Sequence, residues 1–238
     1  SYGIYIKLTT EIQNPIATID VQDYGTIKVE LYPDQAPNTV KNFINLIQKG
    51  YYNGKVLSGL DKNCIYAGKT AEDKIENAKM SLVNSSIEAN SEADKEYSIE
   101  GEFVANGHNN TVKHEKGILS MCRVDYTQYS PALVKQSYNS ANAQFSILIN
   151  DERDLNGMYA GFGRVTKGMD IIEVISKLET KKDENADGAT TNDDENTLKS
   201  FDKMPVIKTM TVETFGVEYD EPERHTPFDY NSYIMQHY

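Results

Sequence analysis

The stretch that decides the fold is GTIKVELYPDQAPNTVKNF, which spans residues 25–43. Its first part, residues 25–31, alternates polar and apolar side chains, which is the pattern of a strand that buries one face. Residues 16–21 alternate in the same way, and only a short turn that ends in Gly25 separates the two runs. The two runs therefore predict an antiparallel hairpin.

A helix is expected next, because the apolar residues change to helical spacing. Pro37 suits the first turn, where a missing N–H costs nothing, and Gly50 suits the left-handed position that ends many helices. Positions three and four apart lie on one face of a helix, so this helix buries one side. The apolar residues that share this side are Val40, Phe43, Ile44 and Ile47.

The rest of the chain contains more strands than helices. The apolar runs at 117–122, 144–149 and 162–165 predict buried strands, and residues 206–217 predict a strand at a sheet edge. Residues 168–177 predict a second amphipathic helix. Many short strands with two clear helices are typical of a closed β-barrel capped by helices, so we expect a mostly β fold.

The domain organisation follows from changes in composition. We expect an N-terminal arm at 1–15, one folded domain at 16–218 and a polar, Tyr-rich C-terminal tail at 219–238. Within the domain, the polar residues 71–96 predict an insertion, and the acidic residues 179–200 predict a solvated loop. Calcium binding is the alternative for this acidic loop, but it lacks the ligand ladder of an EF-hand.

Composition and charge argue against several functions. The chain has 24 Lys and Arg against 36 Asp and Glu, so its formal net charge is −12. An acidic chain repels the phosphate backbone, so we expect no nucleic-acid partner. No apolar run reaches the length of about 20 residues that a membrane-spanning helix needs. We expect a monomer without a membrane span.

Residues with reactive side chains show no convergent pattern. Cys64 and Cys122 lie in apolar contexts without zinc-ligand spacing, which favours buried, inert thiols. The four histidines lack the partners of a metal site or a catalytic triad, and Ser120 and Ser146 lack a nucleophile elbow. We therefore expect no metal and no cofactor. A second Tyr-rich segment offers either a recognition surface or loop packing. Its tyrosines are Tyr126, Tyr129 and Tyr138.

Five strings, in a consistent order, make the sequence resemble cyclophilin-type peptidyl-prolyl isomerases. Besides residues 25–43, they are YYNG at 51–54, GILSM at 117–121, NSANAQF at 139–145 and LNGMYAGFGRV at 155–165. The resemblance covers about residues 16–176. It implies a closed, eight-stranded antiparallel barrel capped by two α-helices, and a groove that binds a proline-containing peptide or protein segment.

The resemblance also implies where the groove should lie. The residues that match the family's substrate-binding positions or lie beside them are Ile65, Ala67, Cys122, Arg123, Gln144, Phe145, Ser146, Leu155 and Tyr159. The family's catalytic arginine comes from a Phe-His-Arg-Val string just after the YYNG turn. In this chain that string reads LSGL, so Gly59 stands at the arginine position.

Two further departures fall on the same groove. Ala67 replaces a glutamine of the family pattern, and Ser146 replaces the second phenylalanine of Gln-Phe-Phe. We therefore expect weak or absent isomerase activity, and the alternative is a non-catalytic peptide-binding or scaffold module. Arg123 is a candidate replacement donor; the other interpretation is that Arg123, Lys62 and Lys69 are ordinary surface cations.

The ends of the chain bear on its location. The string VEYDEPE at 217–223 resembles the ending of cyclophilins from Gram-positive bacteria, and the chain begins at Ser1 rather than at methionine. These features fit an extracytoplasmic protein, secreted or lipid-anchored, whose leader has been removed. A cytoplasmic origin is the alternative.

Overall fold

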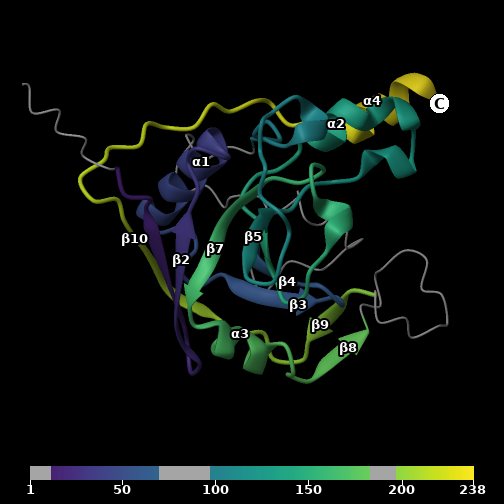
Figure 1. The fold of residues 1–238 in the computed structure, drawn as a ribbon. Helices are drawn as coiled ribbons and strands as arrows, with labels where there is room; N and C mark the ends of the chain where they lie inside the picture. Colours follow the sequence, from purple (N-terminus) through teal and green to yellow (C-terminus); the bar gives the residue numbers. More distant parts are fainter. Residues whose placement is uncertain (1–11, 70–96, 183–196) are drawn as a thin grey trace, which may run out of the picture.

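The computed structural model describes residues 12–69, 97–182 and 197–238 (Figure 1). The predicted insertion at 71–96, most of the predicted N-terminal arm and the central part of the acidic loop lie outside the described residues. The described residues form one antiparallel sheet with a few helices around it, so the expected mostly β fold is confirmed.

The described sheet has ten strands in the order β10-β1-β2-β7-β5-β6-β4-β3-β9-β8. The predicted hairpin is present, with Ile19 opposite Ile27. The strands are β1 (Ile16–Val21), β2 (Gly25–Leu31), β3 (Val56–Leu60), β4 (Cys64–Lys69), β5 (Ile118–Met121), β6 (Phe145–Leu148), β7 (Gly161–Lys167), β8 (Thr180–Lys182), β9 (Lys199–Phe201) and β10 (Ile207–Glu213).

Eight of these strands are joined into a closed ring. At the start of β10, Val206 pairs with Val56, and the Leu57 N–H donates to the Pro205 carbonyl at 2.9 Å. The Ile207 N–H in turn donates to the Lys55 carbonyl at 2.8 Å. These contacts connect β3 to β10, so β8 and β9 are additions to the barrel rather than parts of it. The ends of the predicted acidic loop are thus strands, because β9 finds an open edge of β3 to pair with.

The helices are α1 (Pro37–Gln48), α2 (Val134–Tyr138), α3 (Met169–Ile175) and α4 (Tyr230–His237). The two predicted helices correspond to α1 and α3, which lie toward opposite ends of the barrel (Figure 1). All four predicted apolar residues of α1 are buried, and Gly50 adopts the left-handed conformation (φ 73°) that turns the chain after the helix.

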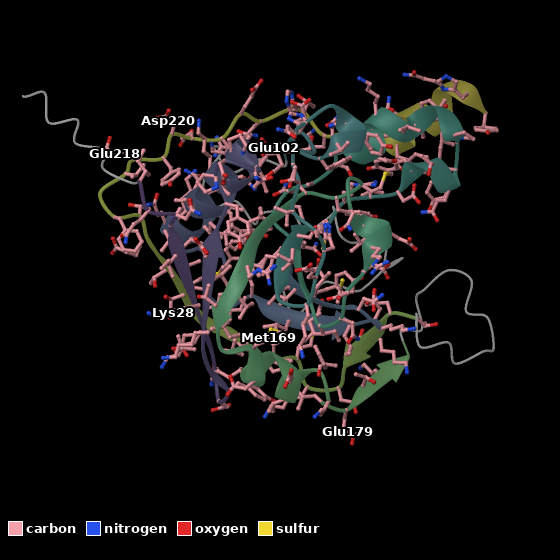
Figure 2. The ribbon with its side chains drawn as sticks, viewed as in Figure 1. Lys28, Glu102, Met169, Glu179, Glu218 and Asp220 are labelled. Atoms are coloured by element: carbon pink, nitrogen blue, oxygen red, sulfur yellow. The ribbon has the colours of Figure 1, made fainter. Side chains whose placement is uncertain are left out.

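A buried carboxylate accepts hydrogen bonds from the main-chain N–H groups in the first turn of α1. Glu102 is 3% exposed and lies beside this helix (Figure 2). It accepts hydrogen bonds from the Thr39 N–H at 2.5 Å, the Thr39 hydroxyl at 2.7 Å and the Asn38 N–H at 3.2 Å. A negative charge at a helix N-terminus is stabilising, so Glu102 fixes α1 to the segment that contains residues 97–103.

Aromatic rings fill the barrel end beneath α1. Phe43 of α1 contacts Phe162 with ring centroids 4.9 Å apart, Phe145 at 5.2 Å and Tyr52 at 5.3 Å. All four side chains are fully buried. The Tyr52 hydroxyl donates to the Ala143 carbonyl at 2.6 Å, so the only polar atom of this aromatic group is paired.

The C-terminal tail is more ordered than its polar composition suggests. It runs along α1, where Asn38 and Glu223 exchange hydrogen bonds, and it pairs His225 with Ser98. It ends in α4, which the sequence analysis did not predict. Aromatic residues around α4 pack on the loop after β5, as Figure 1 shows for α4 and α2. The residues of this small cluster are Val124, Tyr126, Leu133, Phe228, Tyr230 and Tyr233.

Candidate functional site

The predicted groove residues of β4 and β6 divide between two faces of the sheet. Directly paired residues of neighbouring strands point to the same side. Ile65, Ala67 and Phe145 point into the barrel and belong to its main apolar core. Ser146 points outward, in register with Tyr66 on β4 and with Ser120 on β5. The outward face therefore presents polar side chains at this position, next to a small apolar cluster that includes Cys64, Ile118 and Leu148.

Gly59 continues the same row of paired residues, because it lies opposite Tyr66. On its other side it pairs with Ser200 of β9. A Cβ atom built on Gly59 would lie 2.1 Å from the Lys199 carbonyl oxygen and 3.2 Å from the Ser200 Cα. The first distance is far inside van der Waals contact and the second is tight, and both atoms belong to the main chain. Position 59 therefore holds no side chain while β9 stays paired with β3.

The two cysteines behave as the sequence predicted for inert thiols. Cys64 and Cys122 are free and each is 4% exposed. Burial raises the pKa of both thiols, and the neighbouring Asp61 raises them further. Both thiols stay protonated at neutral pH, so neither is a nucleophile. Among the described residues, no group of three His, Cys, Asp or Glu side chains is arranged to hold a metal ion.

Arg123 is buried, so the interpretation as a surface cation is wrong for this residue. It is 8% exposed, and its guanidinium lies 4.2 Å from the ring centroid of Tyr159, 5.1 Å from Tyr138 and 5.4 Å from Phe103. Its Nε and Nη2 donate to the Met158 carbonyl at 3.2 and 3.0 Å. Lys62 is exposed, as predicted, and the side chain of Lys69 lies outside the described residues.

The loop at 155–159 brings two predicted groove residues to Arg123. The Tyr159 N–H donates to the Leu155 carbonyl at 3.1 Å, and the Met158 N–H donates to the same carbonyl at 3.0 Å. This turn holds Tyr159 under the guanidinium and directs the Met158 carbonyl at it. Burial raises the pKa of the Tyr159 hydroxyl, and Arg123 opposes that shift.

Gln144 lies at the junction between β5 and β6. Its side chain is buried, and its carbonyl accepts a hydrogen bond from the Cys122 N–H at 3.1 Å. Cys122, Arg123 and Gln144 therefore lie together where the chain leaves β5. Of the predicted groove residues, those that lie on the outer side of the barrel around this point are Cys122, Arg123, Ser146, Leu155 and Tyr159.

A buried polar network next to this face was not predicted. The His114 Nε2 lies 2.8 Å from the Ser120 hydroxyl, and its Nδ1 lies 3.3 Å from the Asn156 Oδ1. This arrangement has the order of a catalytic triad, but Ser120 is 1% exposed and beyond the reach of a substrate. Burial lowers the pKa of His114 to about 4, so the imidazole is neutral at pH 7. No local pattern predicts this network, because Asn156 is distant from His114 along the chain.

The tyrosines of the loop after β5 are used for packing. Tyr126 stacks on Tyr230 of the tail, with ring centroids 5.8 Å apart, and Tyr129 contacts the same ring at 4.8 Å. Tyr138 packs edge-on against Phe103 at 5.0 Å. Of the two interpretations of this segment, loop packing describes these contacts.

The comparisons agree with the geometry. A family model described as cyclophilin type peptidyl-prolyl cis-trans isomerase/CLD matches residues 16–195. The peptidyl-prolyl cis-trans isomerase CYP23 of Arabidopsis thaliana is 31% identical over 160 residues, which cover 67% of this chain but only 60% of that relative. The peptidyl-prolyl cis-trans isomerase of Acinetobacter baylyi is 30% identical over 161 residues, 66% of this chain and 69% of the relative.

A solved structure supports the fold alone. The cyclophilin-type isomerase of Cryptosporidium parvum, crystallised in the presence of the dipeptide Ala-Pro, superposes with a TM-score of 0.56 at 20% identity. The superposition covers 83% of this chain and 98% of that chain. No helix in the described part of the chain is long and apolar enough to cross a membrane.

Proposed function

This chain belongs to the cyclophilin-type peptidyl-prolyl cis-trans isomerase family, and from that premise we propose that it binds proline-containing segments but isomerises them slowly or not at all. It then acts in protein folding or as a scaffold through binding rather than through turnover. The proposal concerns the family's groove on the outer side of β3–β6, and it rests on the chemistry of position 59.

Prolyl isomerisation needs little chemistry from a protein, which makes the loss of one donor important. Rotation about the X–Pro bond breaks amide resonance, with a barrier of about 18–20 kcal/mol for peptide bonds generally. A catalyst must favour the twisted amide over the planar one, and hydrogen-bond donors placed for the twisted form do so. Losing one such donor typically costs about 10²–10³ in rate. Glycine has no side-chain donor to offer.

The single observation that carries the proposal is the main chain of β9 beside Gly59. The Lys199 carbonyl lies where the first side-chain atom of any other residue would be. The arginine position therefore lacks a side-chain donor, and the space where a side chain would begin is occupied by the main chain of β9. A side chain introduced at 59 must displace β9, and that costs the β3–β9 hydrogen bonds.

The part of the groove that would hold the proline ring is altered as well. Ser146 offers a hydroxyl where the family has a phenylalanine, and its Oγ donates to the Ser120 carbonyl at 3.3 Å. Burying an aromatic side chain contributes roughly 1.5–3 kcal/mol of favourable free energy, so its loss lowers the affinity for a proline ring. Ala67 faces the core and offers no polar group. Both features favour slow turnover and moderate affinity.

The first test compares turnover with binding. Isomerisation of an Ala-Pro peptide is measured by NMR exchange, with the Acinetobacter baylyi relative as the reference enzyme. We expect this chain to be slower by at least about 10²-fold, while the peptide still shifts its NMR signals on binding. A rate near that of the reference enzyme would refute the proposal. Activity that depends on Arg123, and is lost in Arg123→Ala, would identify Arg123 as a replacement donor instead.

A second test addresses the block by β9. The Asp202 N–H donates to the Glu179 carbonyl at 3.0 Å, and Thr180 pairs with Phe201 (Figure 2 labels Glu179). A short Gly/Ser turn can therefore replace residues 180–200 and keep Phe201, which is fully buried in the main core. We expect Gly59→Arg to raise the isomerisation rate in the shortened chain but not in the full chain. The shortened chain with Gly59 intact is the matched control. An equal gain in both backgrounds would show that β9 is not the obstacle.

A further inference from the structure

Arg123 is a buried cation without a countercharge. It follows β5 directly, is 8% exposed and contacts the three rings already described. Among the described residues, no carboxylate forms an ion pair with it, and Asp125, two positions along the chain, uses its Oδ1 to accept from the Thr127 N–H at 3.1 Å. Buried arginines are rarely left unpaired, because taking a charge out of water is costly.

The guanidinium still has donors to offer. Nε and Nη2 both bind the Met158 carbonyl, whereas Nη1 makes no hydrogen bond to a described residue. Nη1 is not fully buried, so it keeps access to solvent. The rings and the carbonyl hold the guanidinium in one orientation, and one amino group is left open for an acceptor.

This open donor lies beside the predicted groove. The turn that Arg123 binds contains Leu155 at its start and Tyr159 at its end, and both match substrate-binding positions of the family. The other predicted groove residues are uncharged at neutral pH. Burial keeps the Cys122 and Tyr159 side chains protonated, so Arg123 is the charged member of the predicted groove residues. Asp61 and Asp125 raise the pKa values of Cys122 and Tyr159, respectively, but neither forms an ion pair with the guanidinium.

We propose that Arg123 forms a carboxylate-binding subsite, so that the groove selects proline-containing peptides that carry a carboxylate near the proline. The inference rests on the proposed peptide-binding function and specifies the ligand. A carboxylate supplies the missing countercharge, and its planar oxygens suit a fixed guanidinium. The chain's net charge of −12 disfavours more highly charged anions, so a single carboxylate fits better than a phosphate.

The test uses three Ala-Pro peptides of equal length, with binding measured by isothermal titration calorimetry. One is capped at both ends and neutral, one has a free C-terminal carboxylate, and one is capped but carries a glutamate beside the Ala-Pro pair. We expect at least one of the two acidic peptides to bind about tenfold tighter than the neutral peptide. Which of the two it is distinguishes a chain terminus from an acidic side chain as the natural source.

Variants assign the effect to Arg123. Arg123→Gln should bind all three peptides equally, whereas Arg123→Lys, which keeps the charge, should retain part of the preference. Lys28→Gln, which removes an exposed cation on β2, changes the net charge by the same amount and should leave the preference intact (Figure 2 labels Lys28). Because Arg123→Lys preserves the charge in the pocket, it keeps the test decisive if Arg123→Gln lowers the melting temperature.

The outcomes separate this inference from the proposed function. Equal binding of the neutral and acidic peptides by the parent chain would overturn the carboxylate subsite and leave peptide binding standing. Absence of binding by all three peptides would overturn both. A preference that persists in Arg123→Gln, or that Lys28→Gln also removes, would assign it to the general charge of the chain and overturn the subsite.

Discussion

The two faces of β6 differ in the side chains that they carry and in what those side chains contact. Phe145 and Ser146 are neighbours on this strand, and both are buried. Phe145 points into the barrel and packs edge-on against Phe43 and Tyr52. Ser146 points outward, where its hydroxyl donates to the Ser120 carbonyl. The interior has the apolar packing that any such barrel needs, whereas the outer face mixes polar side chains with a small apolar cluster.

The packing of this barrel and the surface outside it therefore depend on separate sets of residues. A strand that alternates sides can keep one face for packing and change the other without altering its register. The outer face of this chain is not simply solvated, because His114, Ser120 and Arg123 are all buried there. It combines a polar network, held by hydrogen bonds and by contacts between the guanidinium and aromatic rings, with a small apolar cluster that includes Cys64, Ile118 and Leu148.

The largest expected effect falls on the interior. Phe145→Ala removes a fully buried ring from the aromatic group under α1, and the cavity cannot collapse easily because Phe43 and Tyr52 are held by other contacts. We expect a loss of about 3–5 kcal/mol in the free energy of unfolding, measured by urea denaturation. A loss below about 1 kcal/mol would mean that Phe145 contributes less to the stability of the core than its burial implies.

The next effect depends on pH and falls on the polar network of the outer face, which contains His114. His114 has its pKa lowered from 6.5 to about 4 because it is buried. Between these values the unfolded chain binds a proton that the folded chain does not, so stability falls as the pH drops from about 6.5 toward 4. This one residue contributes roughly 3 kcal/mol of that loss. We expect His114→Gln to flatten the pH dependence by that amount relative to the parent.

Two comparisons make the pH prediction specific. His237→Gln removes an exposed histidine of α4 and controls for the loss of one titratable ring. Phe145→Ala should destabilise the protein equally at both ends of the pH range, since neither Phe145 nor the rings of Phe43 and Tyr52 that it contacts titrate there. If His114→Gln and the parent lost stability in parallel on acidification, the imidazole would not be buried in its neutral form.

A smaller effect is expected at the N-terminus of α1, where Glu102 accepts its hydrogen bonds. Glu102→Gln keeps the shape of the side chain but removes the negative charge that three donors of Asn38 and Thr39 share. Hydrogen bonds to charged groups are worth about 1.5–3 kcal/mol, and glutamine retains one acceptor, so we expect a loss of about 1–2 kcal/mol in the free energy of unfolding. Glu115→Gln, at an exposed pair with Arg164, should cost under about 1 kcal/mol. Equal losses in the two variants would contradict a special role for Glu102.

The barrel followed from local patterns, and the site did so only in part. Alternation and helical spacing act within a few residues, so the first hairpin and both capping helices could be predicted. The family resemblance indicated the groove. It also assigned Ile65, Ala67 and Phe145 to that groove, whereas the pleat turns them into the core.

The contacts that were missed join residues far apart in the chain. The pairing of β9 with β3 depends on a free strand edge beside a glycine, and the composition of residues 179–200 indicated only an acidic loop. The rings around Arg123 come from three separate segments, which no spacing rule connects. The tail was expected to be polar surface, but its aromatic residues pack on the loop after β5. Long-range packing of this kind is decided by the closed barrel rather than by local sequence.

The smallest expected effect returns to β6. Ser146→Ala removes a hydroxyl that donates to the Ser120 carbonyl over a long distance, 3.3 Å, and that also bonds the buried Cys64 thiol, which is a weak partner. A neutral hydrogen bond contributes about 0.5–1.5 kcal/mol net, and a long one lies at the lower end, so we expect a loss of at most about 0.5 kcal/mol in urea denaturation. Phe145→Ala, one residue away, should cost several times more. Similar losses at the two positions would mean that the outer layer of β6 is as important for folding as the core, and that Ser146 is retained for stability rather than being free to differ from the family's phenylalanine.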